Sequence, residues 1–261
     1  MDGFNWLITT QMHIMLMHGA GELDVIFILF LNLLSLSKRL KMIKEEYFKE
    51  LLKFSDIDVA SCINNLRSMS KTIFIYEYHK SEAYKIIKDI DPKTYREAME
   101  LVFLSSKDVS FKKLAAQAHI QSAIYNSRAL YDIFSHLINK VFLKGSVSVD
   151  SCSIDKVKSL LCDGVFKTSL ISAINTDSYF YVNSFVNTIK HRDLVGMTSS
   201  IDFLSDRSGI KFNGFKYNKK DYESLWAIEV LSHSLNVKNN VIDLFDIFKR
   251  ELVNIYRENH C

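Results

Sequence analysis

Proline and glycine are scarce in this chain of 261 residues. It has one proline and eight glycines, where average usage gives roughly thirteen and roughly eighteen. β-Sandwiches, barrels and doubly wound sheets need many turns, so the shortage favours long uninterrupted helices over those folds. Apolar residues make up 48% of the chain, which is enough for a large core and is not typical of a disordered protein.

An excess of one charge and paired cysteines are also lacking. Lys and Arg number 33 against 30 Asp and Glu, a formal charge of +3. Dedicated duplex-DNA binders are usually strongly basic, so that class is disfavoured, although a small phosphate site is not. The cysteines have no paired metal or redox spacing, which is typical of reduced thiols in a reducing compartment. They are Cys62, Cys152, Cys162 and Cys261.

Familiar catalytic motifs are missing as well. The chain has no His-Glu-x-x-His, no P-loop Gly-Lys-Ser/Thr and no Gly-x-Ser-x-Gly, and its eight histidines are scattered. A metalloenzyme or a serine hydrolase is therefore disfavoured, and we expect neither a metal nor a cofactor.

No apolar run at the N-terminus reaches the length of a membrane span. Residues 25–37 carry no charge, but thirteen helical residues rise only about 20 Å, against about 30 Å of hydrocarbon. Asp2 lies where a signal peptide carries basic residues. We expect residues 4–37 to form buried or interface helices in a cytoplasmic protein, with membrane association as the alternative.

The rest of the chain predicts helices with short connections. Residues 210–217 interrupt them, because Asn213-Gly214 predicts a type I′ hairpin that pairs Phe212 with Phe215 and Lys211 with Lys216. The prediction is a single all-α domain over 1–261, with an N-terminal helical layer (1–105) and a bundle (106–261). The predicted helices are 40–54, 56–88 capped by Asp56 or Asp58, 91–104 starting at Asp91-Pro92, 108–143, 154–162 ended by Gly164, 167–195, and 218–258.

Two polar stripes lie on two of these helices. Arg128, Asp132 and His136 follow one another in steps of four, which places them on one helical face. Phe111, Leu114, Ala118, Tyr125 and Ala129 define the neighbouring apolar side of the same helix. The stripe is either a salt-bridged row or part of a site in which Asp132 orients His136.

The second stripe contains Asn183, Asn187 and His191, also in steps of four. Buried amides and imidazoles need partners, so this stripe either hydrogen-bonds the first one or forms a site. Lys190 and Arg192 flank His191 near the predicted helix end, where the helix dipole favours cations.

The segment Val186-Asn187-Thr188-Ile189-Lys190-His191-Arg192 resembles the HEPN superfamily, all-α bundles found in toxins, abortive-infection proteins and RNA-cleaving defence effectors. Asn126–Asp132 and Leu137–Asn139 resemble the preceding bundle helix, and the resemblance covers about 111–258. Active members of that family carry an Arg four to six residues before the His and a polar residue after the Arg. Here Asn187 and His191 match, and Val186 occupies the Arg position.

The resemblance implies metal-independent RNA cleavage at a homodimer interface, in a toxin or defence effector with an antitoxin or another operon-encoded partner. His191 would transfer the proton, Asn187 would hold the imidazole or a phosphate oxygen, and Lys190, Arg192 or Arg128 would supply positive charge. Asp132 and His136 would support this site. The alternatives are a catalytically inactive HEPN-like scaffold that binds a nucleotide, RNA or a protein, and a membrane-peripheral helical protein anchored through residues 4–37.

Overall fold

The computed structural model describes residues 45–53, 56–104 and 106–258. The chain divides into two units, Met1–Tyr47 and Phe48–Cys261. The expectation for residues 4–37 lies outside the described residues. Helix α3 covers Glu45–Leu51, within the predicted helix 40–54. Within the described ranges, no helix has an apolar stretch long enough for a membrane crossing.

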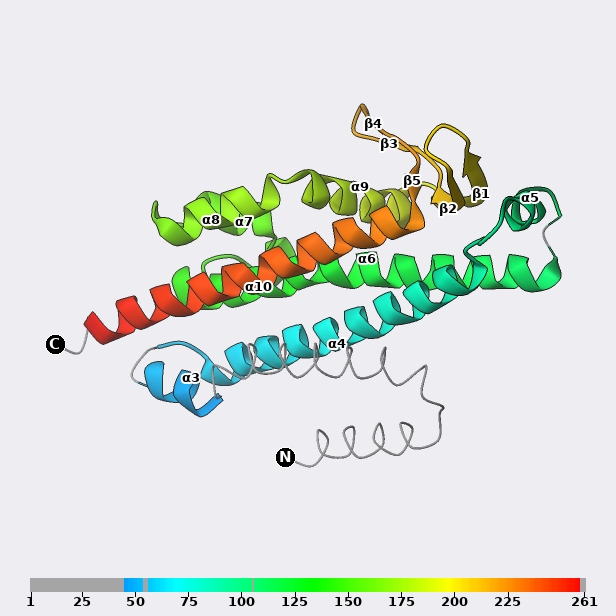
Figure 1. The fold of residues 1–261 in the computed structure, drawn as a ribbon. Helices are drawn as coiled ribbons and strands as arrows, with labels where there is room; N and C mark the ends of the chain where they lie inside the picture. Colours follow the sequence, from blue (N-terminus) through cyan, green and yellow to red (C-terminus); the bar gives the residue numbers. More distant parts are fainter. Residues whose placement is uncertain (1–44, 54–55, 105, 259–261) are drawn as a thin grey trace, which may run out of the picture. The chain divides into compact units, whose positions relative to one another are not determined.

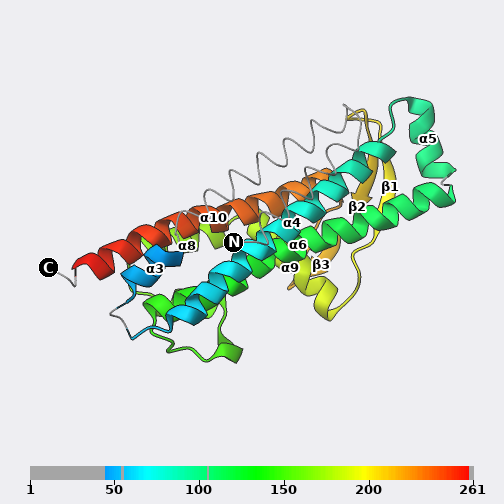
Figure 2. The same ribbon diagram turned by 90° about the horizontal axis from the view of Figure 1, so that it is seen from below.

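Three long helices form the body of the second unit: α4 (Val59–Ile90), α6 (Lys107–Phe142) and α10 (Ala227–Glu258). They run alongside one another (Figures 1 and 2), and the α4–α6 contact is the most extensive one. The prediction of a mostly helical fold is therefore confirmed. Large side chains from all three helices are fully buried at their contacts, among them Ile73, Tyr76, Ile120, Phe134 and Phe248.

Side-chain caps fix where these helices begin. The Asp58 carboxylate accepts a hydrogen bond from the Ser61 amide at 3.0 Å, which confirms the predicted start of α4. Helix α6 begins slightly before the predicted Asp108 or Ser110, because the Ser106 hydroxyl accepts from the Val109 amide.

The predicted helix start at Asp91-Pro92 is wrong. Helix α5 covers Tyr95–Phe103, and the Thr94 side chain caps it by accepting from the Glu97 amide at 3.2 Å. The Glu97 carboxylate in turn accepts from the Lys93 amide at 2.6 Å. These two hydrogen bonds, which join Thr94 to the first turn and Glu97 back to the preceding residue, start α5 after Thr94 in place of the predicted start at Asp91-Pro92.

The structure has two helices where one was predicted over 167–195, and the second of them ends at residue 191 instead of 195. Helix α8 covers Val165–Ile174 and α9 covers Asp177–His191. Thr176 accepts from the Tyr179 amide and starts α9, because its hydroxyl offers the backbone an alternative to continuing α8. Helix α7 covers Ile154–Leu160, so Gly164 does not terminate it and instead directly precedes α8.

The predicted hairpin at Asn213-Gly214 is wrong, because these two residues connect two separate ribbons. Strand β1 (Met197–Asp202) pairs antiparallel with β2 (Arg207–Phe212), so that Phe212 lies opposite Met197. Strand β3 (Phe215–Tyr217) pairs with β4 (Lys220–Tyr222), so that Phe215 lies opposite Tyr222.

The turn with two positive φ angles occurs at Asn218 and Lys219, with φ of 47° and 66°, as a type I′ turn requires. At Gly214 a Cβ atom would lie 2.8 Å from the Tyr222 carbonyl oxygen, so this glycine permits a close backbone approach between segments. Lys211 and Lys216 do not face each other. Lys211 lies opposite Thr198 and Trp226, and Lys216 lies opposite Asp221.

The last helix begins later than predicted. The predicted start near Asn218 lies in the β3–β4 turn, and β5 (Leu225–Trp226) then pairs with β2 before α10 begins at Ala227. The small sheets therefore lie at the N-terminal end of α10 (Figure 1). The apolar side predicted for the second half of α10 is buried at Val241, Leu244, Phe245, Phe248 and Leu252, whereas Ile255 is exposed.

The apolar side of α6 that the sequence indicated is largely exposed. Phe111, Leu114 and Tyr125 of α6 are 71%, 62% and 50% exposed. Tyr95 and Phe103 of α5 are also exposed. The opposite side of α6, which includes Ala116, Ile120 and Ala123, is buried and packs on α4.

Candidate functional site

His191 is the last residue of α9 and lies in solvent, with exposed Lys190 and Arg192 on either side. Among the described residues, the His191 side chain has no hydrogen-bond partner. The negative end of the α9 dipole favours the two neighbouring cations. The imidazole is therefore accessible to a ligand, and it is not used to hold the core together.

Both cations lie over tyrosine rings. The Lys190 Nζ atom is 4.9 Å from the ring centroid of Tyr125 on α6, and the Arg192 Cζ atom is 4.9 Å from that of Tyr217 on β3. The Arg192 guanidinium also donates to the Lys216 carbonyl oxygen at 3.0 Å. His191 is thus flanked by two cation–aromatic pairs that join α6, α9 and β3.

The β3–β4 ribbon continues this surface along α9. The Tyr222 hydroxyl lies 2.7 Å from the Ser184 hydroxyl of α9. The Lys220 Nζ atom is 5.7 Å from the ring centroid of Phe180 and 5.1 Å from that of Tyr222. We call this set the α9 surface: Tyr125, Phe180, Lys190, His191, Arg192, Tyr217 and Lys220.

The two predicted polar stripes meet at one point. The Arg128 Nε atom of α6 donates to the Asn183 side-chain oxygen of α9 at 2.8 Å, and Arg128 Nη1 donates to Asp132 at 2.6 Å. Arg128 also lies 5.9 Å from the Tyr179 ring centroid. These contacts hold α6 and α9 together, so Arg128 is a structural cation with only 17% of its side chain exposed.

The other predicted site residues are not brought together. Asn187 and His136 are half-buried, and neither makes a hydrogen bond to another described residue. Asn187 lies one turn before His191 on α9, as its spacing predicts, whereas His136 lies two turns beyond Arg128 on α6. Val186, at the position of the family Arg, is 5% exposed and packs in the core.

The pKa values of Arg128 and of the tyrosines beside it agree with a structural role for Arg128. Burial opposes the charge of Arg128, but nearby Tyr179 and Asp132 hold its pKa above the usual value. Burial raises the pKa of Tyr179 to about 12 and raises the pKa of Tyr131 further still. All three groups keep their charge state through the physiological pH range.

We expect Arg128→Met to lower the free energy of unfolding by about 2 kcal/mol, because it leaves the Asn183 amide oxygen unpaired near the core. Asp132→Asn should cost less than about 1 kcal/mol, because that carboxylate is 47% exposed and its ion pair is screened. Urea unfolding of both variants measures the difference. Equal losses for the two variants would contradict this assignment.

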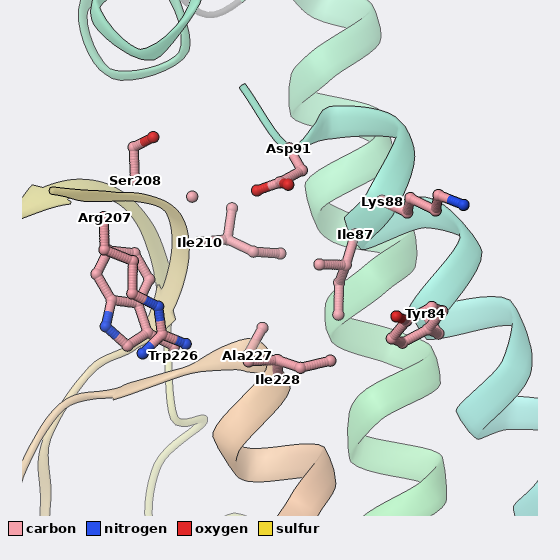
Figure 3. A pocket seen from close by; sticks show the side chains of 11 residues that line it. Tyr84, Ile87, Lys88, Asp91, Arg207, Ser208, Ile210, Trp226, Ala227 and Ile228 are labelled. Carbon is pink, nitrogen blue, oxygen red and sulfur yellow. The ribbon is translucent and has the colours of Figure 1, made fainter. Parts of the chain in front are cut away.

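A pocket of about 360 Å³ lies between the end of α4, strand β2 and the start of α10 (Figure 3). Ile87, Ile210 and Ile228 form its apolar wall, and the Asp91 carboxylate points into it (Figure 3). To one side, the Trp226 ring is contacted by the cations of Arg207 and Lys211 at 4.6 and 4.4 Å from its centroid.

The sequence did not predict this pocket, because its residues come from three distant segments. One local signal was present: Arg207, Gly209 and Lys211 alternate with Ser208 and Ile210, which in a strand places the two cations on one face. The predicted hairpin began at residue 210, so residues 207–209 were not recognised as part of a strand.

The chain matches no protein-family model, no curated protein and no solved structure. The functional interpretation therefore rests on the geometry of the described residues.

Proposed function

We propose that the protein binds single-stranded RNA on the α9 surface and cleaves it without a metal ion, with His191 transferring the proton. The observation that supports this best is the accessible imidazole of His191 between two solvent-facing cation–aromatic pairs, Lys190–Tyr125 and Arg192–Tyr217. Single-stranded nucleic acids are bound by cations that contact phosphates and by aromatic rings that stack on bases. The α9 surface offers both groups around one titratable side chain.

In the proposed reaction the ribose 2′-hydroxyl attacks the adjacent phosphorus, and the bond from phosphorus to the 5′-oxygen breaks. His191 accepts the 2′-hydroxyl proton or protonates the leaving oxygen, and the products carry a 2′,3′-cyclic phosphate and a 5′-hydroxyl. A cation beside the phosphate stabilises the additional negative charge of the phosphorane.

Lys190 and Arg192 are the cations best placed for that role, because both are exposed next to His191. Arg128 is no longer a candidate, since Asn183 and Asp132 engage its guanidinium. Asn187, one turn earlier on α9, would orient the imidazole or hold a phosphate oxygen. Buried Val186 cannot replace the family arginine, so the flanking cations take its place in this proposal.

The fold proposed for the bundle is HEPN-like, with a second copy of the chain completing the RNA groove. The exposed apolar residues Phe111, Leu114 and Tyr125 on α6 support a homodimer, because they form a stripe that continues to Lys190 through Tyr125. Sedimentation equilibrium of the full chain measures this association.

A second candidate is RNA binding without cleavage. It is favoured by one observation: within the described part of the chain, no side chain hydrogen-bonds His191 to fix its tautomer and orientation. Catalytic histidines are usually oriented by such a group. The α9 surface would then act only as a binding platform.

The cleavage test uses the purified full chain with transfer RNA and total RNA in EDTA. We expect products with cyclic-phosphate ends from the parent protein, and a rate lower by a factor of about 10²–10⁴ in His191→Ala. His136→Ala is the matched control, because it removes a histidine that is not part of the α9 surface. Circular dichroism verifies that each variant is folded.

Binding of RNA without any cleavage by the parent protein would select the second candidate. Cleavage that persists in a folded His191→Ala variant would contradict the catalytic role of this residue.

A further inference from the structure

Two histidine side chains meet in the contact between α4 and α6, the two helices that run alongside one another in Figures 1 and 2. The Nδ1 atoms of His79 on α4 and His119 on α6 lie 2.9 Å apart. Their ring centroids are 5.2 Å apart, and the Tyr78 ring lies beside both, at 5.2 and 6.1 Å. Both histidines are half-buried, so the pair lies at the edge of the helix contact.

The short distance between the two Nδ1 atoms limits how many protons the pair can hold. At this distance they form a hydrogen bond only if one nitrogen donates and the other accepts. Two neutral rings can make this bond, and so can one neutral and one charged ring. Two charged rings cannot make it, because both Nδ1 atoms then carry a proton and the positive charges repel each other. The observed contact therefore requires that at least one of the two rings is neutral.

On α4, one acidic side chain acts on the pair. Glu82 lies one turn after His79, and its carboxylate pairs with Lys85 at 2.9 Å. Burial and the His119 ring lower the pKa of His79, and Glu82 opposes this shift without reversing it. The local environment therefore disfavours a charge on His79 while His119 lies beside it.

The helices packed against this turn of α4 offer no compensating anion among the described residues. Residues 115–123 of α6, the two turns around His119, contain no charged side chain. On α10, Lys238 pairs with Glu77 of α4, which also pairs with Lys80. The Glu77 carboxylate is thus engaged by two lysines, and a second positive charge on the histidine pair is left with the repulsion between the rings.

We propose that the His79–His119 pair is a pH-sensitive contact, which holds α4 against α6 near neutral pH and opens when both rings are protonated. Because both side chains are half-buried, two charged rings can separate by turning toward water. The helices then lose contact locally, around residues 75–83 and 115–123, while the rest of their interface stays packed. This proposal is independent of RNA binding on the α9 surface.

The direction of the pH effect follows from proton binding. As the pH falls below about 6.5, the unfolded chain takes up a proton on each histidine. The folded chain takes up fewer, because the second proton breaks the contact. The contribution of the pair to stability is therefore fully present above about pH 6.5, and it is lost as the pH falls from there through the folded-state pKa of His79.

The test compares urea unfolding of the full chain at about pH 7.5 and about pH 5 with that of His79→Gln/His119→Gln, in which neither amide titrates. Between the two pH values, the folding equilibrium constant of the parent should fall by about threefold more than that of the double variant. His136→Gln is the matched control, because it removes a half-buried histidine outside the pair. It should show the same pH dependence as the parent.

Hydrogen exchange followed by mass spectrometry locates the opening. After correction for the intrinsic exchange rates, peptides covering 75–83 and 115–123 should exchange about threefold faster at the lower pH in the parent and not in the double variant. If the double variant does not fold, His119→Gln alone serves both measurements, because it removes the second charge and leaves an amide beside His79.

The proposal is overturned if the parent and the variant lose the same fraction of their folding constant between the two pH values. It is also overturned if acid accelerates exchange equally along the whole of α4 and α6, because the opening would then not be centred on the histidines.

Discussion

Replacing Lys238 with methionine is expected to lower the free energy of unfolding by about 3–5 kcal/mol. Lys238 of α10 pairs with Glu77 of α4 at 2.9 Å, and the two side chains are only 3% and 6% exposed. Burial alone would raise the pKa of Glu77, but Lys238 and Lys80 hold it below the usual value. Without Lys238, the partly exposed Lys80 is the one ionic partner that the Glu77 carboxylate keeps among the described residues.

The matched control for Lys238→Met is Lys249→Met on the same helix. Lys249 pairs with Asp246, whose side chain is 41% exposed, so this change should cost less than about 1 kcal/mol. The double variant Glu77→Leu/Lys238→Met should be more stable than Lys238→Met alone, because it removes both buried charges. Urea unfolding measures all three. Equal losses for the two single variants would show that the buried pair does not act as described.

The Glu77–Lys238 pair also makes the free energy of unfolding depend on pH in the acid range. The folded-state pKa of Glu77 lies below its unfolded value of about 4.3. Its contribution is therefore fully present above that value and is lost as the pH falls through the folded-state pKa. We expect the stability difference between the parent and Glu77→Leu/Lys238→Met to change only below about pH 4, measured by urea unfolding across pH.

The double variant Lys190→Ala/Arg192→Ala is expected to bind single-stranded RNA about tenfold more weakly than the parent. Each substitution removes one phosphate contact and one cation held over a tyrosine ring. For single strands, losing two contacts should also reduce the slope of log affinity against log salt concentration by about 1.4. Fluorescence anisotropy with a labelled oligouridylate at several salt concentrations measures both effects.

The control for this variant is Lys156→Ala/Lys158→Ala on α7, which removes the same charge away from the α9 surface. It should shift affinity slightly and leave the salt slope nearly unchanged. If both double variants weaken binding to the same extent, the protein responds to net charge alone, and the α9 surface has no special role.

The long helices could be predicted because their signals are local. Asp58 caps α4 within three residues of its own position, and the apolar repeat of α10 from Val241 to Leu252 is visible along the sequence. The break at Thr176 and the start of α5 after Thr94 were missed, because each depends on one side-chain oxygen competing with a neighbouring preference. Such competition is decided by less than about 2 kcal/mol.

The ribbons could not be predicted in register, because tertiary contacts set their pairing. Phe212 was predicted to pair with Phe215. In the structure the rings of both residues lie against Phe185 of α9, with centroids 5.4 and 5.6 Å from its own, on separate ribbons. Asn213-Gly214 is the strongest local signal for a hairpin turn, but because of this packing it connects two separate ribbons instead of forming a hairpin.

The candidate site was predictable only in part. The sequence identified His191, Lys190 and Arg192 as one cluster, and it suggested contact between the stripes of Arg128 and Asn183. It could not show that Tyr125 and Tyr217 lie under the two cations, because these rings come from 65 residues before and 25 residues after their partners. The buried Glu77–Lys238 pair joins residues 161 positions apart and had no sequence signal.

The central claim is that RNA lies on the α9 surface. The most direct measurement is photocrosslinking of the full chain to an RNA containing 4-thiouridine, followed by mass spectrometry of the tryptic peptides. We expect adducts on peptides from 180–192 and 215–222 and on the peptide that contains Tyr125, with fewer adducts in Lys190→Ala/Arg192→Ala. Adducts confined to other parts of the chain, or none at RNA concentrations that saturate binding, would contradict the claim.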